Sequence, residues 1–334
     1  MKSAISNPQS AIPHRLAVVL VCATFVLLCA GALVTTEGAG MAFRDWPTSD
    51  GHNMFLYPWF AAAGDKFIEH GHRLMGALVG LITIGVAASL WKSERRHWVV
   101  GLGATALALV IVQGLLGGLR VRADAVLLAR IHGCTGPLFF ALTVALAVVT
   151  SRLWHQQAGT LQLASKNRIP LASLTLTGMI FLQLVVGLHL RHVPATAAAS
   201  TFQTAVFFHL LLAALITGYA ALLVWRVVRS KSTQLRWPAM LLGLFVVAQI
   251  GLGAASWVLK YSWPAGILAD TAFVAGWTNT AGGAAQSLIV TAHVAVGSLL
   301  LGLGVQLSLR AWRLTCQPAL PRLAATTSAL GAAG

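Results

Sequence analysis

The chain has 334 residues, of which 57% are hydrophobic and only 9% charged, and its formal net charge is +15. A soluble domain carries about 25% charged residues, so this composition excludes a soluble protein and indicates an integral membrane protein. The basic residues gather at the ends of apolar segments, which points to membrane topology and contact with anionic lipid, and not to nucleic acid.

Eight apolar segments are long enough to cross a bilayer core of about 30 Å, which takes about 20 helical residues. In chain order they cover residues 15–34, 70–91, 98–118, 131–150, 170–190, 203–225, 237–259 and 286–309. They use most of the chain and leave no room for a soluble domain. The sequence therefore predicts an all-α, polytopic membrane protein with eight transmembrane helices.

Basic residues near span ends stay on the cytoplasmic side. If the N-terminus lies inside, most of the 23 Lys and Arg residues fall at inner span ends, and every acidic residue except Glu94 falls outside. The opening segment "MKSAISNPQSAIPHR" does not look like a transit peptide, and the first span has no evident cleavage site. We expect a multi-pass protein of a bacterial inner membrane with both termini cytoplasmic.

Histidines recur in the outer parts of the even-numbered spans. Because these spans all run from outside to inside, their four imidazoles should lie on the same side of the membrane. Ionisable groups at such depth are costly, face the bundle interior and are usually functional. A single buried histidine more often bonds two helices, but four in a repeated frame favour metal ligation. The four are His72, His132, His209 and His293.

Two other histidines lie near the outer span ends. His70 points about 200° away from His72 around the helix, so we expect it at the membrane interface, and His189 is left unassigned.

The flanking sequences predict an internal duplication. "GHRLMGALVGLITIG" around His72 resembles "FFHLLLAALITGYA" around His209, and "VQGLLGGL" in the third span is echoed by "AQIGLGAA" in the seventh. We expect two pseudo-symmetric four-helix bundles, residues 1–160 and 161–334, each with one histidine pair. Such a pair can hold a haem by both axial positions, whereas zinc would require three or four converging ligands.

The stretch "DKFIEHGHRLMG" adds a carboxylate to the first pair. Glu69 precedes His72 by three residues, so both side chains lie on one helix face. A carboxylate beside a macrocycle edge could stabilise positive charge that appears during oxidation. Alternatively, Glu69 is a first-turn acid favoured by the helix dipole and paired with Arg73. The second half has Val206 at the matching offset, which predicts similar ligation but different chemistry.

Together these residues resemble the heme A synthases of bacteria and mitochondria over nearly all of the eight-span region. The resemblance is strongest in the E-x-x-H-R cluster combined with three further histidines on even spans. The segments that carry it are "GALVTTEGAGMAFRDWP", "EHGHRLMG", "VQGLLGGLRV" followed by "RIHGCTG", "FFHLLLAAL" and "TAHVAVGSLLLG".

The resemblance implies that one half holds haem B as a cofactor and the other takes haem O. The C8 methyl group of haem O would be oxidised to the formyl group of haem A, the cofactor of terminal oxidases. By position, the catalytic acid is Glu69, the substrate haem in 1–160 is held by His72, His132 and Arg73, and haem B in 161–334 is held by His209 and His293, with the four histidines as axial ligands of the haem irons.

The same assignment implies partners and a location. Candidate partners are membrane lipid, haem O, an electron-transfer protein, haem O synthase or oxidase assembly factors, and a second copy of the chain, with no role for nucleic acid. The haem sites should face the outer side. Two other functions stay open: a di-haem b-type electron carrier, which Glu69 argues against, and a cofactor-free transporter, which should have broken helices and charges near the midplane.

Two features depart from the family pattern. Many bacterial relatives carry a cysteine pair in the first outer loop, and "EGAGMAFRDWPTSDGHN" has no cysteine, which puts a thiol-based step in doubt. The stretch "RVRADAVLLAR" is also more basic than an outer loop should be. The arginines Arg120, Arg122 and Arg130, like Arg73, could pair with haem propionates. Alternatively, Arg120 and Arg122 are simply solvated.

Overall fold

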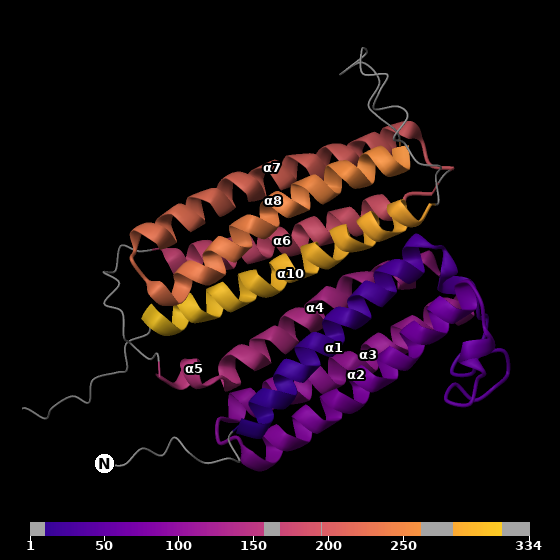
Figure 1. Ribbon diagram of the computed structural model, residues 1–334, viewed down its shortest axis with the longest axis horizontal. Helices are drawn as coiled ribbons and strands as arrows, with labels where there is room; N and C mark the ends of the chain where they lie inside the picture. Colours follow the sequence, from indigo (N-terminus) through magenta and orange to yellow (C-terminus); the bar gives the residue numbers. More distant parts are fainter. Residues whose placement is uncertain (1–10, 157–167, 195, 262–282, 316–334) are drawn as a thin grey trace, which may run out of the picture.

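The structure is a computed structural model that describes residues 11–156, 168–194, 196–261 and 283–315 (Figure 1). Among these residues, eight helices are long and apolar enough to cross a membrane. They are α1 (Ala11–Thr36), α2 (Asp65–Ser93), α3 (His97–Ala123), α4 (Val126–Thr150), α6 (Ile169–Arg191), α7 (Ala199–Arg229), α8 (Thr233–Tyr261) and α10 (Ala284–Thr315). The predicted all-α architecture with eight transmembrane helices is confirmed.

Each helix contains its predicted span and continues beyond it. The helix α2 starts at Asp65, ahead of the apolar run that begins at residue 70. An acid in the first turn favours this start because the helix N-terminus is electropositive. The short elements are α5 (Arg152–Gln156) and the 3-10 turns η2 (Ala39–Met41) and η3 (Trp59–Ala61).

The eight helices pack as two groups of four (Figure 1). In the first bundle α1 contacts α2, α2 contacts α3, α3 contacts α4 and α4 closes the ring on α1. In the second bundle α6, α7, α8 and α10 form a ring in the same order. The bundles meet where α10 contacts α1 and α4, and where α4 contacts α6. The predicted boundary at residue 160 lies outside the described residues, and the duplication itself stays a prediction.

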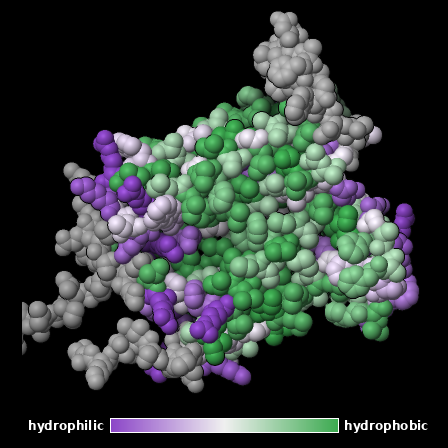
Figure 2. All heavy atoms as spheres, viewed as in Figure 1, coloured by the Kyte–Doolittle hydropathy of each residue, from purple (hydrophilic) through white to green (hydrophobic). Residues whose placement is uncertain are grey.

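Figure 2 shows apolar residues over the middle of the molecule and hydrophilic residues gathered at its two ends. The start of α1 and the end of α10 lie at the same end (Figure 1). We call the opposite end, which carries residues 37–64, the outer end, after the predicted topology. Which end faces the cytoplasm stays a prediction.

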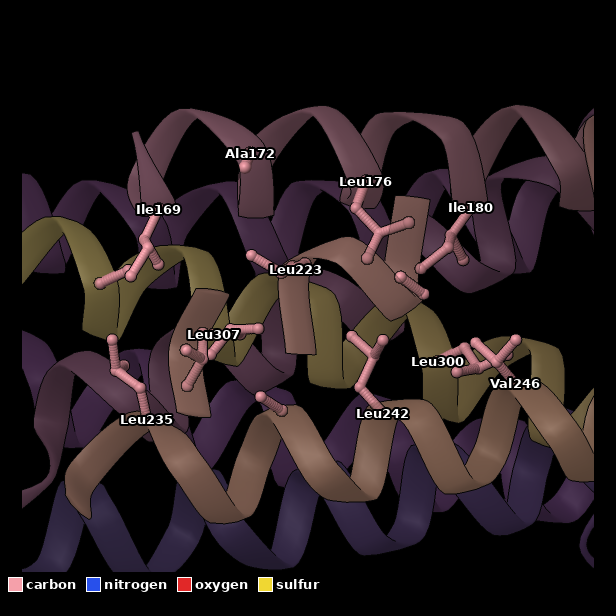
Figure 3. Packing of buried hydrophobic residues seen from close by; sticks show 14 of the residues in the cluster. Ile169, Ala172, Leu176, Ile180, Leu223, Leu235, Leu242, Val246, Leu300 and Leu307 are labelled. Carbon is pink, nitrogen blue, oxygen red and sulfur yellow. The ribbon is translucent and has the colours of Figure 1, made fainter. Parts of the chain in front are cut away.

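The buried hydrophobic residues of each bundle concentrate toward the inner end. In the second bundle they fall within 169–180, 216–227, 235–246 and 300–314, and Figure 3 shows those of 169–180 pointing toward residues of α8 and α10. In the first bundle the cluster likewise includes Ala17 and Leu20 near the start of α1, and Val86 and Leu90 near the end of α2. The inner halves therefore supply the packing, and the four histidines lie in the outer halves.

Candidate functional site

Each of the four histidines lies against a glycine of the preceding long helix. A Cβ added to that glycine would come within 2.9 to 3.2 Å of the imidazole Cε1. Such contacts are tighter than side chains normally make, so only glycine lets the ring approach the neighbouring backbone. The pairs are Gly31 with His72, Gly117 with His132, Gly187 with His209, and Gly253 with His293.

In the second bundle the rings of His209 and His293 come together across the bundle. Their centroids are 6.4 Å apart and their planes meet at 62°. Two metal–nitrogen bonds of about 2 Å, with each ring centroid roughly 1.2 Å behind its nitrogen, would separate the centroids by about 6.4 Å. The spacing of this pair therefore fits one metal held between two imidazoles.

Three of the imidazoles have a buried Nδ1 atom that lacks a hydrogen-bond partner among the described residues: those of His72, His132 and His293. A buried polar atom without a partner is unfavourable, so a hydrogen bond from Nδ1 to another helix does not explain the burial of these rings. Among the described residues no cluster of three or more His, Cys, Asp or Glu gathers. The arrangement offers pairs of imidazoles, which suit a haem iron better than a zinc site.

The side chain of Glu69 is 2% exposed and holds two different partners. Its Oε1 accepts hydrogen bonds from Arg73 Nη2 at 2.7 Å and Nε at 3.1 Å. Its Oε2 accepts one hydrogen bond, from the main-chain N–H of Phe43 at 3.1 Å. The pairing of Glu69 with Arg73 considered from the sequence is therefore present.

The remaining hydrogen bonds of Arg73 go to the chain before α2. Its Nη1 donates to the carbonyl oxygens of Asp45 at 3.0 Å and Thr48 at 2.9 Å. All three guanidinium nitrogens of Arg73 therefore donate within the protein. Its contact with a haem propionate stays a prediction.

Residues 37–64, which we call the outer loop, fold over the outer ends of α2 and α3. The indole of Trp46 lies against Gly118, where any Cβ would collide with it. Arg120 Nη2 donates to the carbonyl of Gly40 at 3.4 Å, and Trp59 Nε1 donates to the carbonyl of Phe67 at 2.9 Å. The outer loop thus covers the first bundle beside Glu69.

The outer loop also buries His70, which is 1% exposed. Its Nδ1 lies 3.2 Å from Ser49 Oγ, and its ring centroid lies 4.7 Å from that of Tyr57. The helix face alone did not predict this burial, because the outer loop returns to cover His70. Its position at the membrane interface stays a prediction.

Asp45 organises the tip of the outer loop. Its carboxylate oxygens accept the N–H groups of Asp50 at 3.0 Å and Gly51 at 2.9 Å. Burial acts to raise the pKa of Asp45, but hydrogen bonds from Thr48 and from these backbone N–H groups outweigh it and lower the pKa below its ordinary value of 3.8. The carboxylate is therefore charged at neutral pH and holds the turn.

The outer arginines are placed differently from one another. The Nε atoms of Arg120 and Arg130 are buried without a hydrogen-bond partner among the described residues, whereas Arg122 is exposed. Arg130 Nη2 donates to the carbonyl of His192 at 2.6 Å. The contacts of these arginines with propionates stay predictions.

Sequence reasoning missed Arg191. Its Nη2 donates to the carbonyl of Ala32, at 3.0 Å, and to the hydroxyl of Thr36, so it ties α6 to α1 between the two bundles. A basic residue at the outer end of a span, against the topology rule, was the available signal. His189, close to it on α6, is exposed.

Comparisons of the sequence with known proteins identify one family. The model of the COX15-CtaA family, described as cytochrome oxidase assembly protein, matches residues 61–275, more than half of the chain. The chain is 28% identical over 202 residues to a heme A synthase of Shouchella clausii, covering 56% of this chain and 62% of that protein. It is 26% identical over 245 residues to a heme A synthase of Alkalihalophilus pseudofirmus, covering 67% and 80%.

A shorter segment of 126 residues is 33% identical to a protoheme IX farnesyltransferase of Halobacterium salinarum, covering 37% of this chain and 27% of that protein. The chain therefore spans less than two thirds of the length of the Shouchella and Halobacterium relatives.

Proposed function

The chain belongs to the COX15-CtaA family of cytochrome oxidase assembly proteins, and from that membership we propose that it is a heme A synthase. It oxidises the C8 methyl group of haem O to the formyl group of haem A. The observation that carries the proposal is that each bundle has two histidines against glycines, and that among the described residues one acid, Glu69 of the first bundle, is buried.

In the second bundle His209 and His293 hold haem B. The 6.4 Å separation of their ring centroids supports this assignment, as do the glycines that let each ring lie against the neighbouring helix. In the first bundle His72 and His132 hold the substrate haem. The bound haems supply the redox chemistry, and the protein supplies the ligands, the orientation and the local charge.

Glu69 acts as the charged residue beside the substrate. Both bonds from Arg73 fall on Oε1, whereas Oε2 accepts only the N–H of Phe43, so Oε2 keeps capacity to face another group. Arg73 fixes the carboxylate in one orientation. A preorganised charge of this kind stabilises positive charge that develops on the substrate during oxidation.

The outer loop limits the access of water to this carboxylate. Phe43 is fully buried and Ser49 is buried beside His70, so the loop packs over the outer end of α2. Exclusion of water strengthens the interaction between Glu69 and a developing charge.

Conversion of a methyl to a formyl group removes electrons and adds an oxygen atom, so an electron acceptor is required. We assign this part to an electron-transfer partner. The relative named protoheme IX farnesyltransferase shares a segment with this chain, which supports an enzyme that farnesylates haem, and so makes haem O, as a neighbouring partner. Oxidase assembly factors, membrane lipid and a second copy of the chain complete the partners.

The proposed setting is the bacterial inner membrane, with both termini cytoplasmic and the haem sites toward the outer side. The basic inner span ends support this orientation. All four histidines lie toward the end that carries the outer loop, so the haem sites share the side of that loop.

The test is to express the chain in bacteria that make haem O but lack haem A, and to identify the haems extracted from membranes and from the purified protein. We expect haem A in the membranes and haem B on the protein. Two equivalent b-type haems without any haem A would favour the electron carrier, and colourless protein would favour the transporter.

A further inference from the structure

We infer that half-buried glutamines position three of the four ligand histidines, and that His72 alone lacks such a residue and is the exchangeable ligand. This inference rests on the proposed function, because it treats the histidines as haem ligands. The glutamines are Gln113, Gln183 and Gln249.

Each glutamine lies four residues before the glycine that contacts a histidine ring. Gln113 precedes Gly117, Gln183 precedes Gly187 and Gln249 precedes Gly253. Residues four apart lie on the same face of a helix, so each glutamine faces the same neighbouring helix as the glycine. On α1 the corresponding position, four residues before Gly31, is occupied by Leu27.

The contacts of Gln183 are direct. Its Nε2 donates to the main-chain carbonyl of His209 at 3.0 Å and lies 3.2 and 3.3 Å from the two ring nitrogens. A carbonyl in a helix can accept a second hydrogen bond because it has two lone pairs. Gln183 therefore holds the backbone that carries this histidine and lies against its ring.

Gln113 holds α4 in a similar way. Its Nε2 donates to the carbonyl of His132 at 3.3 Å, and its Oε1 accepts a hydrogen bond from the hydroxyl of Thr135. The amide thus bridges α3 and α4 at the turn that carries the ligand.

A second set of glycines makes room for the amides. Gly136 and Gly297 each lie four residues after a ligand histidine, and an added Cβ there would be 3.2 Å from Nε2 of Gln113 and of Gln249, respectively. Gly76 has the same place after His72, but a Cβ there would meet nothing within 4 Å. The side chain of Leu27 has no polar group, so no side-chain amide supports His72 at this position.

The distribution follows the different tasks of the bundles. The second bundle, which must retain haem B, has a glutamine beside each ligand. The first bundle, which must take in substrate and release product, has a glutamine beside His132 and none beside His72. A ligand that dissociates more readily allows the haem to exchange without disturbing the rest of the site.

The experiment measures how fast carbon monoxide binds to the reduced haems of the purified protein, since carbon monoxide must wait for an axial histidine to leave. In Gln183→Leu we expect binding at haem B to become about 5-fold faster, the size expected from one lost hydrogen bond. The matched control is Gln234→Leu. Gln234 lies at the inner end of α8, and like Gln183 it has a buried Oε1 without a hydrogen-bond partner among the described residues. Its substitution should leave the rate of carbon monoxide binding unchanged.

The reciprocal variant Leu27→Gln adds an amide opposite His72 and does not depend on a loss of stability. We expect it to slow carbon monoxide binding to the haem of the first bundle by about 5-fold and to slow the release of haem from that bundle. Loss of haem B from Gln183→Leu, with Gln234→Leu unaffected, would also support the inference.

Two failures can be told apart. Wild-type protein with histidine-ligated haem, together with unchanged rates in both Gln183→Leu and Leu27→Gln, would overturn the inference alone. Wild-type protein that binds no haem would overturn the proposed function.

Discussion

The two bundles share a frame and differ in what surrounds it. Both are rings of four helices with their buried hydrophobic residues toward the inner end, and both place two histidines against glycines in the outer half. Among the described residues only the first bundle has a buried acid, Glu69, paired with Arg73 and covered by the outer loop; the second has Val206 at the matching position. A repeated ligand frame can therefore acquire a distinct chemistry from a few residues at one end.

The largest effect should come from deletion of a ligand in the second bundle. In His293→Ala we expect haem B binding to fall more than about 100-fold and haem A production to stop. Loss of a ligand should exceed the effect of losing a residue that only orients a ligand through a hydrogen bond. Haem analysis of the purified variant measures this. His189→Ala, at an exposed position of α6, is the control and should behave as wild type. Loss of haem B from His72→Ala, with none from His293→Ala, would reverse the assignment of the bundles.

The second effect sharpens the chemical difference between the bundles. Glu69→Gln keeps the size of the side chain but removes its charge, and we expect haem A production to fall by about 10² to 10³ while both haem sites still bind. Haem O should accumulate in the membranes. The exposed acid Glu37 gives the control Glu37→Gln. Normal haem A production by Glu69→Gln would leave the carboxylate as a structural anchor for Arg73 and the outer loop.

A smaller effect tests whether the glycines hold the frame in common. A methyl group at Gly253 would stand 3.1 Å from the ring of His293, so Gly253→Ala should weaken haem B binding by about 1–3 kcal/mol, as overpacking does. Gly76→Ala, where the methyl group meets nothing within 4 Å, should be neutral or slightly stabilising because alanine favours helix. Haem titration of the two variants compares them, and equal affinities would show that the close glycine contact is dispensable.

The smallest effect concerns the outer loop, a segment that has no counterpart in the described part of the second bundle. Because the pKa of Asp45 is lowered on folding, its contribution is present above pH 3.8 and is lost as the pH falls below that value. We expect the hydrogen bonds from Asp45 to protect the amides of Asp50 and Gly51 from hydrogen exchange by less than about 1 kcal/mol. This protection should vanish well below pH 3.8. Asp45→Asn should abolish the pH dependence, and a variant that kept it would assign the titration to another group.

The sequence determined the features that depend on length, polarity and order. Eight apolar runs became eight helices, because a backbone in lipid must satisfy its hydrogen bonds within the helix. The placement of four histidines toward one common end of the molecule followed from span direction alone; they are His72, His132, His209 and His293. The pairing of Glu69 with Arg73 was also accessible, since residues four apart meet on a helix.

Only the tertiary structure decided which groups meet across the chain. Arg191 bonds Ala32 over a separation of 159 residues, and His70 is buried by a loop that no helical periodicity describes. The contact of Gln183 with His209 depends on how closely α6 and α7 approach at Gly187. Such contacts arise from the packing of side chains between helices, where small residues set the distance, and a pattern along one helix contains no information about that distance.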